Sequence, residues 1–237
     1  MKLDSSSVTL VLVGTFPSAA FSIESLAKTD SIGSDDARLA TYEAFVRGQV
    51  CDIRLPWGKF AAVEDKLVVE VNEAPYVRAV DLAIKCLRDI SSGGVVRQMG
   101  INHLAFFEAT LEERDVIGRR LLPPENWGGF GTEVAKGFNY AVKDPRHGGL
   151  TIAVLRLGKF DDRPGGYTDA RVEPGNRGHT TGIVVSINDH YEMPPNKDGS
   201  PVSDRAATAA LLDYLEGNFD NSVERSIRFV NQIIEGK

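Results

Sequence analysis

The chain has little cysteine and little histidine. Two cysteines and four histidines occur among 237 residues, and Cys51 and Cys86 are too far apart to form a CxxC pair. The residues around Cys51 have a strand-like pattern and those around Cys86 a helical one. This predicts two buried thiols in a reducing compartment, and therefore a cytoplasmic protein, and it excludes a disulfide-rich scaffold.

Several motifs of catalysis and ligand binding are also absent. A P-loop needs Gly-Lys followed by Ser or Thr so that backbone amides and the lysine surround the phosphates, but Gly58-Lys59 and Gly158-Lys159 are each followed by phenylalanine. The nucleophile elbow, the His-Glu-x-x-His and paired-cysteine metal motifs, the deaminase signature and the EF-hand spacing are missing too. We therefore expect no metal and no cofactor, and the sequence favours a non-enzymatic protein over an enzyme.

Strong charge of either sign is lacking as well. Before Pro123 there are 14 basic and 17 acidic residues, and from Pro123 onwards 13 and 16, so each part contributes −3 to the net charge of −6. This even distribution lacks the positive field that attracts phosphate backbones, which disfavours a nucleic-acid-binding protein. That alternative depends on a local basic strip, for which the candidates are Arg156, Lys159, Arg163, Arg171 and Arg177.

No long hydrophobic run is present. A helix that spans a bilayer needs about 20 apolar residues, and no segment approaches that length. The apolar run at residues 8–13 is short and β-branched, and Asp4 precedes it. It therefore predicts a strand better than the core of a signal peptide, and we expect no membrane span.

The sequence does contain clear strand patterns. Alternating or β-branched segments predict strands at residues 8–16, 50–55, 59–63, 67–72, 97–107, 150–157, 167–172 and 180–188. Leu67, Val69 and Val71 share one face of their segment, which is typical of a half-buried antiparallel strand. The segment 97–107 has apolar residues on both faces, so we expect a central strand covered on both sides.

Helix patterns accompany these strands. Thr110 and Glu113 form a capping box at the start of a helix that runs to about Leu122, where Pro123-Pro124 ends it. Apolar residues at helical spacing predict further helices at 75–90, 205–216 and 219–234. The sequence thus predicts an α+β fold in which mostly antiparallel sheets pack with helices and the C-terminus is helical.

We expect two lobes, at residues 1–122 and 123–237, that share one interlocked unit, with two helices at the end of the second. The segments 68–76 and 184–191 are similar, since each has a strand pattern, an asparagine with an acidic residue, a tyrosine and then a predicted helix. This similarity indicates an internal repeat. The alternative is two unrelated strands that each leave a sheet through an Asx-type turn.

Glycine and proline are concentrated in the second lobe. Twelve of the 23 glycines lie between Gly128 and Gly182, and eight of the 11 prolines lie at or after Pro123. Loops held on a scaffold often carry function, although such glycines also serve ordinary hairpins. Arg/His pairs on loops can bind an anion, and Asp next to His can form a polar cluster. The candidate ligand-binding residues are Arg146, His147, Arg177, His179, Asp189 and His190.

Two further polar features have a structural interpretation. His103 lies on the apolar face of a predicted strand, and we interpret it as a core histidine bonded to a neighbour. Asp161 and Asp162 could supply carboxylates to a metal, but the Arg-Pro-Gly-Gly that follows them fits a charged turn better. No catalytic residue is assigned.

One strand carries a resemblance to a known family. The strand Arg97-Gln98-Met99-Gly100-Ile101-Asn102-His103, the helix after it and the helical ending resemble a sporadically distributed, uncharacterised bacterial protein family of similar length. Members of that family have Arg and Tyr where this chain has Asn102 and His103. The resemblance implies a two-lobed α+β fold without a known activity. Because sporadic distribution is typical of mobile-element, toxin or phage-defence neighbourhoods, it also implies such a context.

These features lead to one expectation about function and two alternatives. We expect a non-enzymatic binding or assembly protein, a component of a multi-protein bacterial system such as phage defence, which has a protein partner and could form a homo-oligomer. The first alternative is a hydrolase or nucleotide-acting enzyme whose site is assembled from His147, His179, Asp189 and His190, because catalytic groups can converge from distant loops. The second is a nucleic-acid-binding module that uses the basic strip.

Overall fold

One antiparallel sheet organises the fold. The computed structural model describes residues 1–91, 93–123, 125–126, 128, 150–156, 164–178 and 180–236. Within these residues, nine strands form a single sheet in the order β2-β3-β4-β5-β1-β6-β9-β8-β7. The strands are β1 (Lys2–Thr15), β2 (Thr41–Val46), β3 (Val50–Leu55), β4 (Gly58–Val63), β5 (Lys66–Val71), β6 (Val95–Glu108), β7 (Leu150–Arg156), β8 (Gly165–Arg177) and β9 (Thr180–Glu192).

Helices connect these strands and follow the last one. The described helices are the 3₁₀ turn η1 (Ser18–Ala20), α1 (Ile23–Lys28), α2 (Ser34–Leu39), α3 (Arg78–Lys85) with its π-helical extension η2 (Cys86–Ile90), α4 (Leu111–Leu121) and α6 (Asp204–Glu235). The predicted capping box is confirmed, because Thr110 accepts from the Glu113 amide and Glu113 accepts from the Thr110 amide. The fold is α+β with a helical C-terminus, as the sequence predicts.

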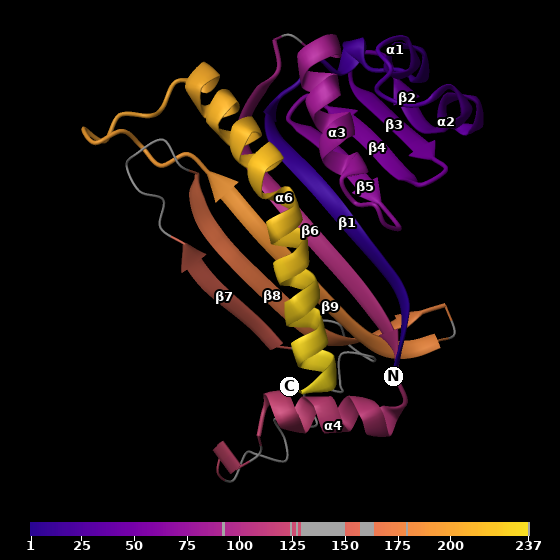
Figure 1. The fold of residues 1–237 in the computed structure, drawn as a ribbon, viewed down its shortest axis with the longest axis vertical. Coiled ribbons are helices and arrows are strands. Elements are labelled where there is room, and N and C mark those ends of the chain that lie inside the picture. The colour runs from indigo at the N-terminus through magenta and orange to yellow at the C-terminus, as the bar shows by residue number, and fades with distance from the viewer. Residues whose placement is uncertain are drawn as a thin grey trace.

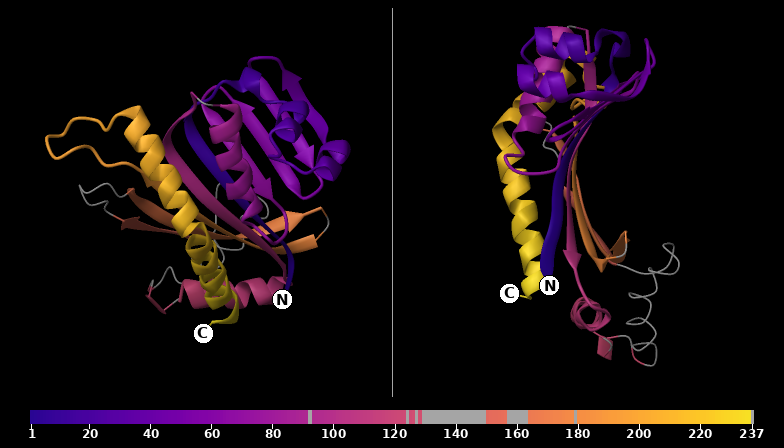
Figure 2. Two further views of the ribbon diagram at one scale, coloured as in Figure 1. Left: turned by 45° about the horizontal axis from the view of Figure 1, so that its top comes forward. Right: turned by 90° about the vertical axis from the view of Figure 1, so that its right-hand side faces the viewer.

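The helices cover one face of the sheet. Figure 1 shows α6 running along β6 and β9, with α3 beside it near β1 and β5. Figure 2 shows both helices on the same side of the sheet, while α4 lies at its lower end. No described helix packs along the opposite side. We call the two sides the covered face and the open face.

The core lies between the covered face and the helices. Leu67, Val69 and Val71 of β5 are fully buried, which confirms the predicted half-buried pattern. A first buried cluster joins β1 and β3–β5 to α3 and the first half of α6. A second joins the end of β6, β8 and β9 to Ile117 of α4 and the last turns of α6. Helix α6 contributes to both clusters and therefore links the two halves of the sheet.

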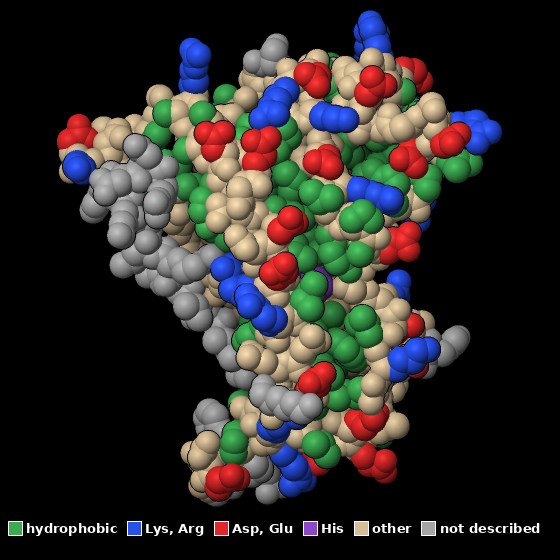
Figure 3. All heavy atoms as spheres, viewed as in Figure 1, with side chains coloured by type: hydrophobic (Ala, Val, Ile, Leu, Met, Phe, Trp, Pro, Cys, Tyr) green, Lys and Arg blue, Asp and Glu red, His purple; other side chains and the backbone are tan. Residues whose placement is uncertain are grey.

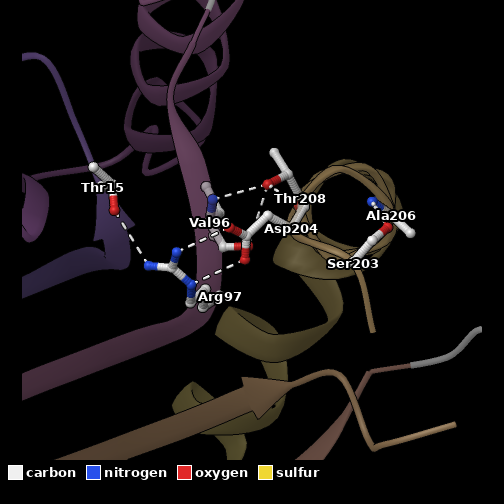
Figure 4. Close-up of polar contacts among 7 residues, drawn as sticks. All are labelled: Thr15, Val96, Arg97, Ser203, Asp204, Ala206 and Thr208. Carbon is white, nitrogen blue, oxygen red and sulfur yellow. Dashed lines mark hydrogen bonds and ion pairs between the residues drawn. The ribbon is translucent and has the colours of Figure 1, made fainter. Parts of the chain in front are cut away.

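Polar contacts fix the start of α6 against β6 (Figure 4). Arg97 donates from Nε and Nη2 to the two carboxylate oxygens of Asp204 at 3.0 and 2.9 Å. The Val96 amide donates to Thr208 Oγ1 at 2.9 Å. Ser203 accepts from the Ala206 amide as the N-cap. These contacts satisfy one free amide of the helix end and set where the helix begins on the sheet.

The prediction of two C-terminal helices is wrong, because α6 is a single helix of 32 residues. The sequence suggests a break at Gly217 and Asn218, which are both weak helix formers. However, Leu215, Phe219 and Val223 remain buried on both sides of this point. Packing of one continuous stripe against the sheet outweighs the local propensity.

Four other elements differ from the prediction. The elements β2, α1 and α2 are not predicted, since all residues of β2 are exposed and the two helices have six residues each. Strand β6 is central, as predicted, but among the described residues its open face is only partly covered, since Phe106 is buried there and Leu104 is not. Leu104 on its open face is 45% exposed, whereas His103 on its covered face is 3% exposed. The prediction from apolar residues on both faces of the strand therefore overestimated its burial.

The topology repeats itself around the pair β1–β6. In each half a long strand, β1 or β6, is joined by a last antiparallel strand, β5 or β9, and a helix follows, α3 or α6. Val71 pairs with Val8, Val8 with His103, and His103 with Ile187. Val71 and Ile187 are matching positions in the two similar sequence segments. The register therefore agrees with a pseudo-two-fold axis near the Val8–His103 pair, which supports the predicted internal repeat.

The predicted lobes contribute adjacent strands to this one sheet. Strand β6 of the first lobe pairs with β9 of the second along eleven residue pairs. The boundary at residue 122 stays a prediction, because most of the segment after it lies outside the described residues.

Candidate binding site on the open sheet face

Only some of the candidate residues fall in the described part of the chain. Arg146, His147 and His179 lie outside the described residues, as do Asp161 and Asp162. Arg177 ends β8, and Asp189 and His190 lie near the end of β9.

Asp189 and His190 point to opposite faces, since successive side chains of a strand alternate. Asp189 is fully buried on the covered face. Its carboxylate accepts hydrogen bonds from the hydroxyls of Thr168 and Ser222 and forms an ion pair with Arg225. Partial burial lowers the pKa of Arg225, but its hydrogen bonds and charge interactions with Tyr191 and Asp189 outweigh this effect and raise it. The carboxylate thus fastens α6 to β8 and β9.

His190 lies on the open face in a polar band. Its ring stacks on Tyr167 with the centroids 4.8 Å apart and an angle of 21° between the planes. His190 Nε2 is 3.9 Å from Glu192 Oε2, and Glu192 also accepts from Gln98 at 3.1 Å. Further along the same face, Asn188 donates to Asp169 at 3.3 Å. These contacts tie β6, β9 and β8 together.

Arg177 lies far from His190. Thr180 is the partner of Arg177 at the tip of the β8–β9 hairpin, and His190 follows ten residues later along β9. At 3.3 Å per residue, the two side chains are about 30 Å apart along the strand. Arg177 Nη1 instead donates to Asp4 at 3.3 Å. The structure therefore does not bring these two candidates into one site.

Arg177 does border a cavity of about 560 Å³ on the open face. This volume lies in the range of ligand pockets. The cavity lies where residues of β1, β6 and the end of β5 meet the end of the β8–β9 hairpin. Its lining residues are Ser5, Ser6, Ser7, Glu70, Asn72, Leu104, Phe106, Asn176, Arg177 and Val184. Most come from the open-face positions of the two central strands and their neighbours.

Two glycines lie next to the lining residues Phe106 and Val184 of this cavity. Gly175 and Gly182 face each other across the β8–β9 pair. A Cβ atom on Gly182 would lie 2.7 Å from the ring of Phe106 and 2.1 Å from the carbonyl oxygen of Phe107. Glycine at this position therefore lets the hairpin pass close to the end of β6, with the Phe106 ring packed against it.

The chemistry of the cavity is suited to binding. It has one acidic and one basic side chain, Glu70 and Arg177, and the charge of Arg177 is already paired with Asp4. Serine hydroxyls and asparagine amides provide neutral donors and acceptors, and Leu104 provides an exposed apolar surface. Within the described lining there is no histidine, cysteine or lysine to act as base or nucleophile.

His103 lies on the other side of the sheet from this cavity and is a core histidine, as predicted. Burial lowers its pKa, so the ring is neutral at pH 7. Tyr76 donates to Ser6 Oγ at 3.1 Å, and Ser6 Oγ lies 2.8 Å from His103 Nε2. Tyr76, Ser6 and His103 thus form one chain of hydrogen bonds, in which the tautomer of His103 sets whether Ser6 Oγ or Nε2 is the donor. Among the described residues Nδ1 has no hydrogen-bond partner, and a catalytic Ser–His pair would need a group there to orient the ring.

The described side chains give little support to a basic strip that binds nucleic acid or to a metal site. Arg171 pairs with Glu173 and Arg177 with Asp4, so these two members of the basic strip are neutralised. Lys159 and Arg163 lie outside the described residues, and nothing is described of the Arg156 side chain. On the covered face, Lys and Arg side chains are interspersed with Asp and Glu (Figure 3). No group of three metal-ligating side chains occurs in the described ranges.

Both cysteines are buried free thiols, as predicted. Burial is the main cause that raises the pKa of Cys51 to about 11, and it raises that of Cys86 further. Neither thiol is therefore suited to nucleophilic chemistry at neutral pH.

A second, larger cavity of about 820 Å³ lies between the loop after β9 and the first half of α6. It is lined mostly by small or apolar groups such as Met193, Pro194 and Ala206. Its polar lining residues are Asn196, Lys197, Asp213 and Tyr214. Polar residues make up a larger share of the lining of the cavity on the open face, which is therefore the better candidate for a specific ligand site.

Comparison with known proteins adds no functional information. No family model matches the chain, and no curated protein matches it. Among the helices in the described ranges, none is both long enough and apolar enough to cross a membrane.

Proposed function

We propose that this chain is a non-enzymatic binding or assembly protein that holds a segment of a partner protein on its open sheet face. The observation that supports this most is Leu104. It lies on a central strand of a nine-stranded sheet and remains 45% exposed beside a cavity with serine and asparagine side chains. Protein interfaces combine apolar contacts with hydrogen bonds, and Leu104 and the polar lining of the cavity offer both.

The shape and charge of the site favour a protein segment over a small ligand. A small molecule usually has most of its surface enclosed, whereas here Leu104 is open to solvent. The cavity has no positive excess that would select an anion, because Arg177 is paired with Asp4 and Glu70 adds a negative charge. Serine hydroxyls and asparagine amides can bond the N–H and C=O groups of an extended peptide, while an apolar side chain of the peptide packs on Leu104.

The wider setting also remains a proposal. The resemblance to a sporadically distributed bacterial family supports a component of a multi-protein bacterial system such as phage defence. In that setting the partner would be another protein of the same system.

Selection of peptides from a displayed random library tests this function. We expect enriched peptides to carry an apolar residue and to bind the purified chain. Leu104→Asp should weaken their binding roughly tenfold or more, because the apolar contact is lost and a charge is introduced in its place. Leu111→Asp is the matched control, since Leu111 is 67% exposed on α4 and does not line the cavity. The proposal fails if no peptide is enriched, or if both variants bind the peptides equally.

A further inference from the structure

Within the described part of the chain, Glu70 is the charged side chain of the cavity lining that has no ion pair. It lies half-buried on β5 and borders the cavity on the open face. Lys59 is its neighbour on β4, but the Lys59 ammonium binds Glu43 and Asp52 at 3.0 and 2.9 Å instead. Among the described residues, the Glu70 carboxylate accepts no hydrogen bond. Its charge is therefore left for a group that enters the cavity.

The other charges at the cavity do not compensate Glu70. Arg177 is the basic side chain of the lining, and its Nη1 atom lies 3.3 Å from an Asp4 carboxylate oxygen. The described lining contains no further Lys, Arg, Asp or Glu. Glu70 and Asp4 are negative and Arg177 is positive, so one negative charge remains. Because binding surfaces have complementary potentials, the partner should bring a positive charge to this site.

The sheet register sets the separation between Glu70 and Leu104. On β1, Thr9 pairs with Glu70 and Ser7 pairs with Leu104. Glu70 and Leu104 are therefore two strands apart, about 10 Å, and two residues apart along the strands, about 7 Å. The diagonal between their Cα atoms is thus about 12 Å. In an extended segment, residues i and i+4 point to the same side and lie about 13 Å apart, which matches this separation.

We propose that the partner segment carries a lysine or arginine that pairs with Glu70, four residues from the apolar residue that packs on Leu104. This inference rests on the proposed function, because it specifies the partner of the same site. An ammonium or guanidinium forms a charge-assisted hydrogen bond with a carboxylate, which is stronger than a bond between neutral groups. An acidic residue at that position would be repelled by Glu70, so the pair selects basic segments over acidic ones.

Peptides enriched from the displayed library test this inference with the wild-type chain. They should carry Lys or Arg four positions from the apolar residue. Replacing that basic residue by Gln should weaken binding about threefold to tenfold in fluorescence anisotropy, and the difference should shrink at high salt. Enriched peptides that need Leu104 but carry no basic residue would overturn this inference and leave the proposed function standing. A library without enriched peptides would overturn both.

A double-mutant cycle tests the pairing with Glu70. Glu70→Gln keeps the shape of the side chain and removes its charge. It should weaken the basic peptide about threefold to tenfold and change binding of the Gln-substituted peptide by less than about twofold. Glu64→Gln is the matched control, since Glu64 is exposed in the turn between β4 and β5 and does not line the cavity. An equal effect of Glu70→Gln on both peptides, or no effect on the basic one, would overturn the inference.

Discussion

Loss of the Arg225 charge should destabilise the fold more than loss of the charge of its partner, Asp189. Asp189 is fully buried, whereas the Arg225 side chain is 45% exposed. Arg225→Met removes the Arg225 cation from this buried carboxylate, whose partners include the hydroxyls of Thr168 and Ser222. Breaking a buried ion pair in this way costs about 3–5 kcal/mol. Because Arg225 is partly solvated, we expect about 2–4 kcal/mol here.

The opposite change should cost less. Asp189→Asn keeps an oxygen that can accept from the two hydroxyls, and Arg225 can rehydrate at the surface. We expect about 1–2 kcal/mol, the range for weakening a buried hydrogen-bonded group. The double variant should be more stable than Arg225→Met alone, because no buried charge remains. This order of stabilities follows from the unequal burial of the two partners.

Urea unfolding followed by far-ultraviolet circular dichroism and by tryptophan fluorescence measures these differences. For a chain of this size, a loss of 2–4 kcal/mol lowers the Tm by roughly 4–16 °C. Arg228→Met is a control on the same helix, since Arg228 is exposed. The reasoning is refuted if Arg225→Met is as stable as Arg228→Met, or if Asp189→Asn is the less stable member of the pair.

Further predictions concern single residues. Cys51 and Cys86 should react with a thiol reagent only when the chain unfolds, as burial raises the pKa of both; rapid labelling of the native protein would contradict this. Burial lowers the pKa of His103, so the stability that the neutral ring contributes is complete above its unfolded pKa of about 6.5 and declines as the pH falls below that value. The urea midpoints at pH 7.5 and 5.5 should therefore differ less in His103→Gln than in the wild type. Gly182→Ala should destabilise by about 1–3 kcal/mol because its Cβ meets the backbone of β6. By contrast, the added Cβ of Gly217→Ala in α6 meets no atom, and this change should stabilise the fold by about 0.5–1 kcal/mol. Urea unfolding in which both variants change the stability in the same direction would refute the comparison.

The predicted strands agree well with the structure where periodicity is strong. The predicted segment 50–55 coincides with β3, and the capping box at Thr110 marks the start of α4. Such features depend on neighbours in the sequence, which is why they can be recognised without the fold. Strand β2 has no alternation to detect, because neither of its faces is buried.

The candidate site was only partly predictable. Arg177 was a candidate and borders the cavity, but Leu104 was expected to be covered. Exposure of a residue on a central strand depends on whether a helix crosses that face, and no local pattern carries this information. Asp189 and His190 are neighbours in the sequence, yet the pleat of β9 places one in a buried ion pair and the other on the open face.

By itself, the sequence determined the α+β class, most strand and helix positions, the burial of the two thiols and the similarity of its two halves. All of these follow from local periodicity, capping and composition. Only the tertiary structure decided that both halves share one sheet, that α6 is continuous and that the described helices pack on one face of the sheet. These properties arise from contacts between residues far apart in the chain, such as the row from Val71 through Val8 and His103 to Ile187. Their free energy depends on packing across the sheet, which local sequence does not specify.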